Sequence, residues 1–207
     1  MDKRDHWNAR YKDKALRWSA GPNELFAAIA QELAPGTALD VASGEGRTAL
    51  WLAEQGWRVD AIDFSDVGID KGRKMAAQRD VSVNWIVGDV SDYPFQRLHY
   101  DVVAVIYLHT SEIERAAWLP RVIQAVRPGG SFIYIAHDPS NIEKGVGGPQ
   151  DLALLPSIEA LEPFLDGFEF RRAEVYERAV DGDPGHGGAL TGVALDTLIW
   201  AVRPFEC

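Results

Sequence analysis

The hydrophobic positions of this chain follow two spacings, one typical of buried strands and one typical of helices that pack on a sheet. Strands are predicted where apolar and β-branched residues gather, at residues 37–42, 58–63, 81–87, 100–108 and 131–137. Helices are predicted between and around them, beginning with residues 24–34, which a proline and a glycine follow. Strands that alternate with helices are typical of a parallel sheet covered on both faces.

Polar residues mark where several of the helices begin. Ser65 can accept the first backbone N–H groups of the helix after the second strand. Ser111 and Glu114 have the spacing of a capping box, which predicts a helix after the fourth strand. The end of the chain predicts one more helix and two strands, at residues 157–165, 169–178 and 190–202.

The stretch from residue 37 to residue 63 carries the strongest chemical signal. A strand leads into a turn with Gly44 and Gly46, then a helix, then a second strand that ends at Asp63. Glycines let the backbone approach a ligand, and the N-terminus of the helix offers N–H groups to a carboxylate or phosphate. An acid at the end of the second strand can accept hydrogen bonds from ribose hydroxyls. The stretch therefore predicts a site for a cofactor that contains a nucleoside.

From these residues alone, two kinds of cofactor remain open. Residues 44–49 satisfy the dinucleotide fingerprint G-x-G-x-x-G/A, and Asp63 follows Gly44 at about the expected 20 positions, which favours NAD. Against NAD, Asp40 and Glu45 would bring two negative charges close to a diphosphate. An acid at position 40 suits a cationic amino group better, and the bulky Arg47 lies where helix and strand must approach the ligand.

Short motifs occur in order along the chain, at residues 40–46 (DVASGEG), 63–65 (DFS), 88–90 (GDV) and 127–130 (RPGG). Together they resemble the motifs of class I S-adenosylmethionine (SAM) methyltransferases. Ser43 departs from the glycine or cysteine common in that family, although it is still a small residue. The opening W-N-x-R-Y at residues 7–11 most resembles the tellurite-resistance and thiopurine methyltransferase branch, whose members modify small molecules.

The resemblance implies a Rossmann-like α/β fold with a seven-stranded, mostly parallel sheet, helices on both faces and a C-terminal antiparallel hairpin. It also implies SAM as the cofactor, S-adenosylhomocysteine (SAH) as the product and a small molecule as the methyl acceptor. In this resemblance Asp40 and the glycines hold the methionine end, Asp63 binds the ribose and Asp89 accepts from the adenine amino group. The residues implied to contact the cofactor are Trp18, Asp40, Gly44, Gly46, Arg47, Asp63, Phe64, Asp89, Val90 and Tyr107.

The first 22 residues are rich in aromatic side chains and form a predicted lid segment ahead of a single domain at residues 23–207. Trp7, Tyr11 and Trp18 would exclude water from the cofactor, and an aromatic face stabilises a cation by about 0.5–2 kcal/mol. The alternative is that these rings anchor an N-terminal helix to the sheet. The resemblance favours a place for Trp18 at the cofactor.

Tyr107, His109 and His137 follow the fourth and fifth strands and are the predicted catalytic residues. Ligands of such sheets bind beyond the carboxyl ends of the strands. Methyl transfer is an in-line displacement, so positioning the reactants supplies most of the acceleration. A thiolate, a chalcogen anion or a heterocyclic nitrogen needs no base, whereas a hydroxyl acceptor needs one, and either histidine is a candidate. The plainer alternative is a hydrogen-bonded histidine at a strand end.

Two other functions remain open from the sequence. An NAD-dependent oxidoreductase on the same fold would need a proton donor such as a Tyr-x-x-x-Lys pair, which the sequence lacks. A non-catalytic SAM-binding protein would carry the same cofactor motifs. No metal site is predicted, because carboxylates do not cluster after the fourth strand.

Composition adds several exclusions. The formal net charge of −10 disfavours nucleic acid and anionic membrane surfaces as partners. The single cysteine, Cys207, excludes a disulfide framework, and no signal peptide is evident, so the expected location is cytoplasmic. The sequence defines neither the acceptor nor the oligomeric state.

Overall fold

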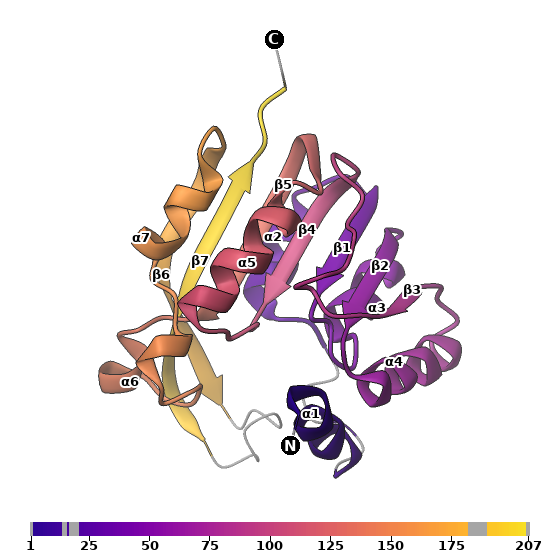
Figure 1. Cartoon of the computed structure of the whole chain (residues 1–207), viewed down its shortest axis with the longest axis horizontal. Coiled ribbons are helices and arrows are strands. Elements are labelled where there is room, and N and C mark those ends of the chain that lie inside the picture. Colours follow the sequence, from indigo (N-terminus) through magenta and orange to yellow (C-terminus); the bar gives the residue numbers. More distant parts are fainter. Residues whose placement is uncertain (1, 14–15, 17–20, 182–189, 206–207) are drawn as a thin grey trace. The chain divides into compact units, whose positions relative to one another are not determined.

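The computed structural model describes residues 2–13, 16, 21–181 and 190–205. Within these residues the strands form a seven-stranded sheet in the order β3-β2-β1-β4-β5-β7-β6 (Figure 1). Its strands are β1 (Thr37–Val41), β2 (Arg58–Asp63), β3 (Asn84–Val87), β4 (Tyr100–Ile106), β5 (Val126–His137), β6 (Glu169–Asp181) and β7 (Thr191–Val202). The predicted fold class, a mostly parallel sheet that ends in an antiparallel pair, is confirmed. The chain divides into two compact units at residues 1–94 and 95–207.

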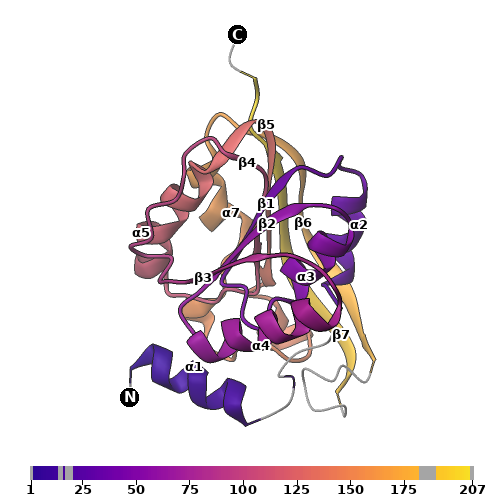
Figure 2. The same cartoon turned by 90° about the vertical axis from the view of Figure 1, so that its right-hand side faces the viewer.

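The first unit contains β1, β2 and β3, which pair in parallel with Val41 opposite Ile62 and Asp63 opposite Val87. Its helices are α1 (Lys3–Lys12), α2 (Glu24–Gln31), α3 (Arg47–Glu54) and α4 (Asp66–Gln78). The side chain of Ser65 caps α4 by accepting from the backbone N–H of Gly68, as predicted. Helix α1 lies alongside α4 (Figure 2).

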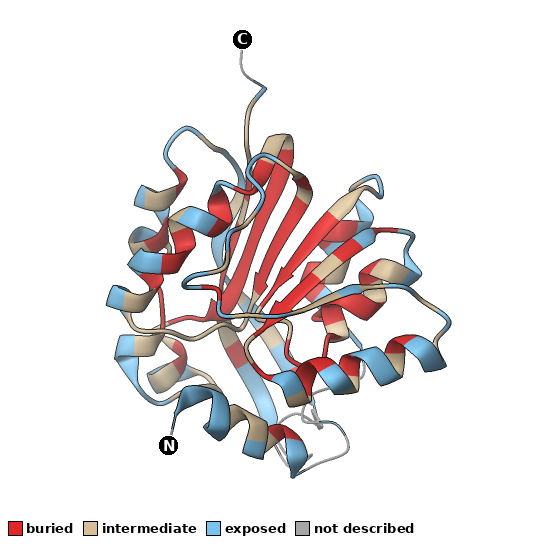
Figure 3. Ribbon diagram, turned by 45° about the vertical axis from the view of Figure 1, so that its right-hand side comes forward, coloured by how far each residue is buried: buried red, intermediate tan, exposed pale blue. Residues whose placement is uncertain are grey.

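The second unit contains β4 and β5 in parallel, and β7 and β6 added in the antiparallel sense. Its helices are α5 (Glu112–Ile123), α6 (Asn141–Lys144) and α7 (Ile158–Leu161), with 3₁₀ turns η1 (Leu152–Leu154) and η2 (Glu162–Leu165). The capping box of Ser111 and Glu114 at the start of α5 is present. Strands β4 and β5 are buried along most of their length, as expected for central parallel strands (Figure 3).

Several predicted boundaries differ from those in the structure, and two of the differences have a local cause. β3 begins at Asn84 and not at residue 81, because the backbone N–H of Val81 still donates to Ala76 O at the end of α4. The RPGG turn lies inside β5, where Gly129 has a φ of +75° and its N–H donates to Arg203 O.

No helix in the described ranges combines the length and the apolar character needed to cross a lipid bilayer.

Candidate cofactor and acceptor sites

The turn between β1 and α3, residues 42–46, is called the glycine turn below. Ala42, Gly44 and Gly46 all have left-handed backbone angles, with φ of 55°, 57° and 81°. Two hydrogen bonds fix its path, from Gly46 N to Ser43 O (2.8 Å) and from Ser43 N to Ile62 O (2.9 Å). The left-handed region strains residues other than glycine, so the strain at Ala42 marks this turn as a candidate functional site.

Asp63 joins the end of β2 to the glycine turn. One of its carboxylate oxygens accepts from Gly44 N at 2.8 Å, and the other accepts from Ser65 N at 2.7 Å. Burial raises the pKa of Asp63, while the hydrogen bonds from Ser65 and Gly44 act in the opposite direction. The predicted ribose ligand is therefore also the residue that holds the glycine turn in place.

Asp40 is buried below the first turn of α3. Its Oδ2 accepts from the backbone N–H of Ala49 at 3.0 Å, so it caps the helix that begins after Gly46. Burial raises the pKa of Asp40 to about 7, although the N–H of Ala49 and the charge of Arg47 oppose the shift. Its proposed contact with a cationic amino group would therefore also keep this carboxyl ionised.

Glu45 does not add an unbalanced negative charge to the turn. Its Oε1 lies 2.9 Å from Lys71 Nζ on α4, and the Glu45 side chain is almost fully buried. The sequence-based objection to a diphosphate at this site therefore depends on Asp40 more than on Glu45.

Trp85 on β3 packs against the glycine turn, which the sequence did not indicate. A Cβ atom built on Gly46 would lie 2.2 Å from Cη2 of Trp85, and one on Gly72 of α4 would lie 2.5 Å from the same atom. Glycine is needed at both positions because the indole fills the space that a side chain would occupy.

The other predicted cofactor residues of the first unit lie at or after strand ends. Phe64 directly follows β2 and is half-buried. Asp89 is exposed, and its Oδ1 accepts from Ser91 N at 2.8 Å, so it also shapes the loop after β3. Val90 is buried. Trp18 lies outside the described residues.

Helix α1 is fastened to the start of α4 and to the glycine turn. Asn8 donates to Asp66 Oδ1 at 2.7 Å and accepts from Ser65 Oγ at 2.6 Å. Tyr11 is buried, and its hydroxyl oxygen would lie 2.6 Å from a Cβ atom on Gly44. Asn8 and Tyr11 of the W-N-x-R-Y motif thus contact α4 and the glycine turn, and whether the aromatic residues form a lid or an anchor stays a prediction.

In the second unit, the three predicted catalytic residues lie together at the carboxyl ends of β4 and β5. The ring centroids of Tyr107 and His137 are 4.9 Å apart, and those of His109 and His137 are 5.4 Å apart. Tyr107 has a φ of 58°, a strained backbone held by the hydrogen bond from its N–H to Ile135 O. Burial, with a further contribution from His137, lowers the pKa of His109 to about 3.

Asp196 of β7 belongs to this group, although no pattern in the sequence indicated it. It pairs with His137 across the β5–β7 ladder and is fully buried. Its Oδ2 accepts from Tyr107 Oη at 2.6 Å and from Arg178 Nε at 2.8 Å. The five residues Tyr107, His109, His137, Arg178 and Asp196 are called the Asp196 cluster below.

Known proteins that are similar to this chain are methyltransferases. Residues 38–130 match the family described as "Methyltransferase domain". A 2-heptyl-1-hydroxyquinolin-4(1H)-one methyltransferase from Mycobacteroides abscessus is 26% identical over 141 residues, which are 66% of this chain and 62% of the relative. Nearly half of the chain therefore matches a methyltransferase domain.

Solved structures agree with this methyltransferase fold. TehB from Haemophilus influenzae matches with a TM-score of 0.73 at 15% identity, over 98% of this chain and 68% of that one. Magnesium protoporphyrin IX methyltransferase from Synechocystis, solved with bound SAH, matches with a TM-score of 0.64 at 16% identity, over 87% and 80%. The chain spans less than two thirds of the length of the curated relatives that it matches first.

SAM is the cofactor of class I methyltransferases, and the glycine turn of this chain fits it. Ser43 Oγ is buried in the turn and forms no hydrogen bond with any described residue. Such an orphaned polar atom beside a helix N-terminus is suited to the carboxylate of an amino-acid ligand.

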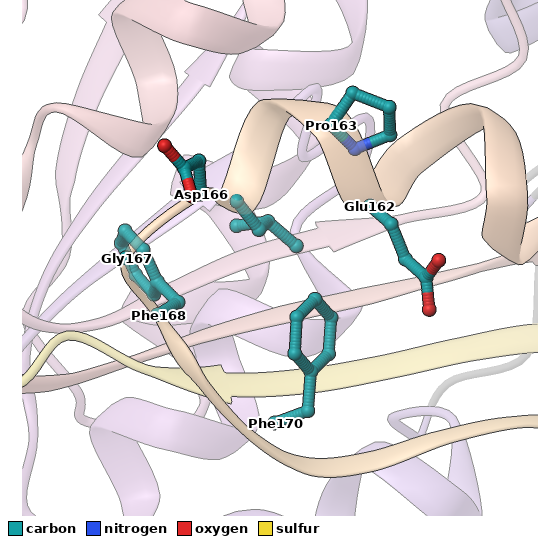
Figure 4. A pocket seen from close by; sticks show the side chains of 7 residues that line it. Glu162, Pro163, Asp166, Gly167, Phe168 and Phe170 are labelled. Atoms are coloured by element: carbon teal, nitrogen blue, oxygen red, sulfur yellow. The ribbon is translucent and has the colours of Figure 1, made fainter.

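A separate surface hollow of about 570 Å³ occurs in the second unit (Figure 4). Its lining residues are Glu162, Pro163, Leu165, Asp166, Gly167, Phe168 and Phe170. Val202 of β7 pairs with both Glu169 and Ser131, whereas His137 lies at the other end of β5. The hollow is therefore at the end of the strands away from the catalytic candidates, where ligands of such sheets do not bind.

The attachment of α1 gives a first prediction. Replacing Asn8 with alanine removes both of its side-chain hydrogen bonds, so amide hydrogen exchange in α1 is expected to accelerate by about tenfold, corresponding to about 1.4 kcal/mol. Asn84→Ala is the matched control, because it removes a bond to Asp60 on a different edge of the same unit. Equal exchange rates in α1 for both variants would show that Asn8 is not an anchor.

Proposed function

We propose that this protein transfers a methyl group from SAM to a small-molecule acceptor. The observation that carries the proposal is the link between the glycine turn and Asp63, which prepares a nucleoside site at the ends of β1 and β2. The match of residues 38–130 to the methyltransferase domain supports it. SAM supplies an electrophilic methyl group on a sulfonium, and the chain's residues bind and orient the reactants.

The residues of the first unit are proposed to hold the cofactor. Asp40, Ser43 and the N–H groups of the glycine turn bind its methionine end, and Asp63 accepts hydrogen bonds from its ribose. Both oxygens of Asp63 already accept one backbone N–H each, and a carboxylate oxygen has room for a second donor. Phe64, Val90 and Asp89 enclose the adenine, with Arg47 and Trp18 as further contacts.

The Asp196 cluster is proposed to bind the acceptor, with Tyr107, His109 and His137 as the catalytic candidates. Its three rings favour an aromatic or heterocyclic acceptor, because rings gain about 0.5–1.5 kcal/mol from each other beyond area burial. Relatives named for a hydroxyquinolinone and for demethylmenaquinone support this class. The W-N-x-R-Y opening at residues 7–11 supports the narrower placement in the tellurite-resistance and thiopurine branch.

Calorimetric titration with SAH tests the cofactor half of the proposal. We expect micromolar binding by the wild-type protein and binding at least about tenfold weaker by Asp63→Ala, a loss of about 1.4 kcal/mol. Asp60→Ala, earlier on the same strand, is the control and should bind like the wild type. NADH should not bind. A wild-type protein that binds NADH and not SAH would refute the proposal.

An assay of methyl transfer tests the other half of the proposal, which concerns the acceptor. The protein is incubated with SAM and either 2-heptyl-1-hydroxyquinolin-4(1H)-one or a member of a panel of phenols, thiols and heterocycles. Mass spectrometry of these mixtures should reveal SAH and a methylated product. A protein that binds SAH and methylates no member of such a panel would be better described as a SAM-binding protein.

A further inference from the structure

Asp196 is a fully buried carboxylate on which side chains from three other strands or strand ends converge. Tyr107 after β4 and Arg178 of β6 both donate to its Oδ2, at 2.6 and 2.8 Å. His137 at the end of β5 faces the other oxygen, with Nδ1 lying 3.5 Å from Oδ1. Removing a carboxylate charge from water is costly unless an opposite charge or hydrogen-bond donors stabilise it. The groups around Asp196 therefore have to supply that stabilisation.

The two oxygens of Asp196 are in different situations. Oδ2 has two donors, including the guanidinium that balances the carboxylate charge. Oδ1 is buried and accepts no hydrogen bond from any described residue. A buried acceptor left in this state costs about 1–3 kcal/mol. At 3.5 Å, His137 Nδ1 is the group that a small movement would bring to hydrogen-bond distance.

Two other titratable residues, Asp138 and His109, lie near His137. Neither presents a carboxylate to the His137 ring as Asp196 does. Asp138, the next residue, is turned to Thr197 and Ser140, accepting from their hydroxyls at 2.7 and 2.5 Å. His109 faces His137 from the β4 end, and burial lowers its pKa to about 3, so it is neutral at neutral pH. The lowered pKa makes His109 a weak proton acceptor, so the geometry at His137 decides which of the two catalytic candidates acts as the base.

We propose that Asp196 is a positioning residue that holds the Nδ1–H of His137, so that Nε2 removes the proton from an O–H or S–H acceptor. The inference deepens the proposed function and rests on it. The acceptor loses its proton to Nε2, its oxygen or sulfur forms the new bond to the methyl carbon, and the electron pair of the broken bond remains on the departing sulfur. The positive charge ends on the imidazolium of His137, beside Asp196.

Two features of the cluster suit this role. Tyr107 and Arg178 fix the Asp196 carboxylate, so its Oδ1 keeps its direction while His137 changes charge. The backbone of Gly148 lies against the ring, since a Cβ atom there would come within 2.6 Å of His137 Nε2. Reaching Nε2 therefore requires residues 147–148 to shift when an acceptor binds, and both have left-handed φ angles that favour glycine.

The first test observes His137 directly and needs no acceptor. In ¹⁵N-histidine-labelled protein saturated with SAH, with the His137 signals assigned from the His137→Gln variant, the wild-type ring should be protonated at Nδ1 and bare at Nε2. Asp196→Asn removes the carboxylate with little change of shape and should give a mixture of the two tautomers. Asp138→Asn, the neighbouring buried aspartate, is the control and should keep the wild-type tautomer. Unchanged His137 signals in Asp196→Asn would overturn the proposal.

The second test separates a proton-transfer role from a structural one. Phenol ionises near pH 10, as tyrosine does, whereas 4-nitrophenol is largely ionised at about pH 8 and needs no base. With these two probe acceptors at about pH 8, Asp196→Asn should lower the rate on phenol by about 100-fold or more and the rate on 4-nitrophenol by less than about threefold. Equal losses on both acceptors would assign Asp196 a structural role only.

SAH titration distinguishes the failure of this inference from the failure of the proposed function. Asp196→Asn should bind SAH like the wild type, because the predicted cofactor residues of the first unit are unchanged. If the wild type binds no SAH, the proposed function fails. If it binds SAH and the tautomer of His137 is independent of Asp196, the inference alone fails.

Discussion

Replacing Gly46 with alanine is expected to abolish measurable SAH binding and to lower the free energy of unfolding by about 3 kcal/mol or more. A left-handed φ of +81° costs a residue with a side chain about 1–2 kcal/mol. The new Cβ atom would also lie 2.2 Å from Cη2 of Trp85, and forced overpacking costs about 1–3 kcal/mol. Chemical denaturation measures the stability, and calorimetric titration measures the binding.

The chain offers a matched control for this prediction. Gly56 has a similar φ of +87°, but a Cβ atom there meets nothing within 4 Å. Gly56→Ala therefore carries the backbone strain without the clash, and should cost less than Gly46→Ala and leave SAH binding intact. In Gly46→Ala combined with Trp85→Ala, the clash is gone, so the cost should be less than the sum of the two single changes. Equal effects of Gly46→Ala and Gly56→Ala would show that the indole contact is unimportant.

Local signals in the sequence predicted the fold well, because they act through neighbouring residues. β2 has the predicted bounds, Arg58–Asp63, since its buried positions follow directly from the sequence pattern. The caps at Ser65 and Ser111 are also confirmed, because a cap depends on a few consecutive residues.

The sequence pattern failed where a contact joins distant parts of the chain. Trp85 is an ordinary aromatic residue of a strand until the structure brings its ring against Gly46 and Gly72. Asp196 is one acid in a C-terminal strand until the antiparallel pairing places it opposite His137. Such features depend on register and packing, which composition and periodicity do not specify.

The residues of the candidate site that lie close together in the sequence were predicted better than those that the fold brings together. The glycine turn and Asp63 lie within one strand–helix–strand stretch, so their hydrogen bond follows from a short motif. The grouping of Tyr107, His109 and His137 was expected from the shared carboxyl edge of parallel strands, and their proximity is now established. Their catalytic roles stay predictions, as do the ligand roles of the first unit.

Asp40→Asn is expected to change the pH dependence of stability. The pKa of Asp40 is raised from 3.8 to about 7 in the folded protein, so the folded state binds this proton more tightly than the unfolded state does. Its contribution to stability is therefore fully present below about pH 4 and is lost as the pH rises to about 7. Asparagine can still accept from the N–H of Ala49 and carries no charge that burial would penalise.

The unfolding free energy of Asp40→Asn, relative to the wild type, should thus increase between about pH 4 and pH 8, by up to about 4 kcal/mol if the whole shift is expressed. Urea denaturation at a series of pH values measures the difference, with Asp60→Asn as the control on the neighbouring strand. SAH binding should weaken in the same Asp40 variant, because the proposed partner of the cationic amino group loses its charge. If the difference in unfolding free energy is instead independent of pH while SAH binding is weakened, Asp40 is a cofactor ligand whose burial does not lower stability. A rising difference with unchanged binding would make Asp40 a helix cap and remove it from the proposed cofactor contacts.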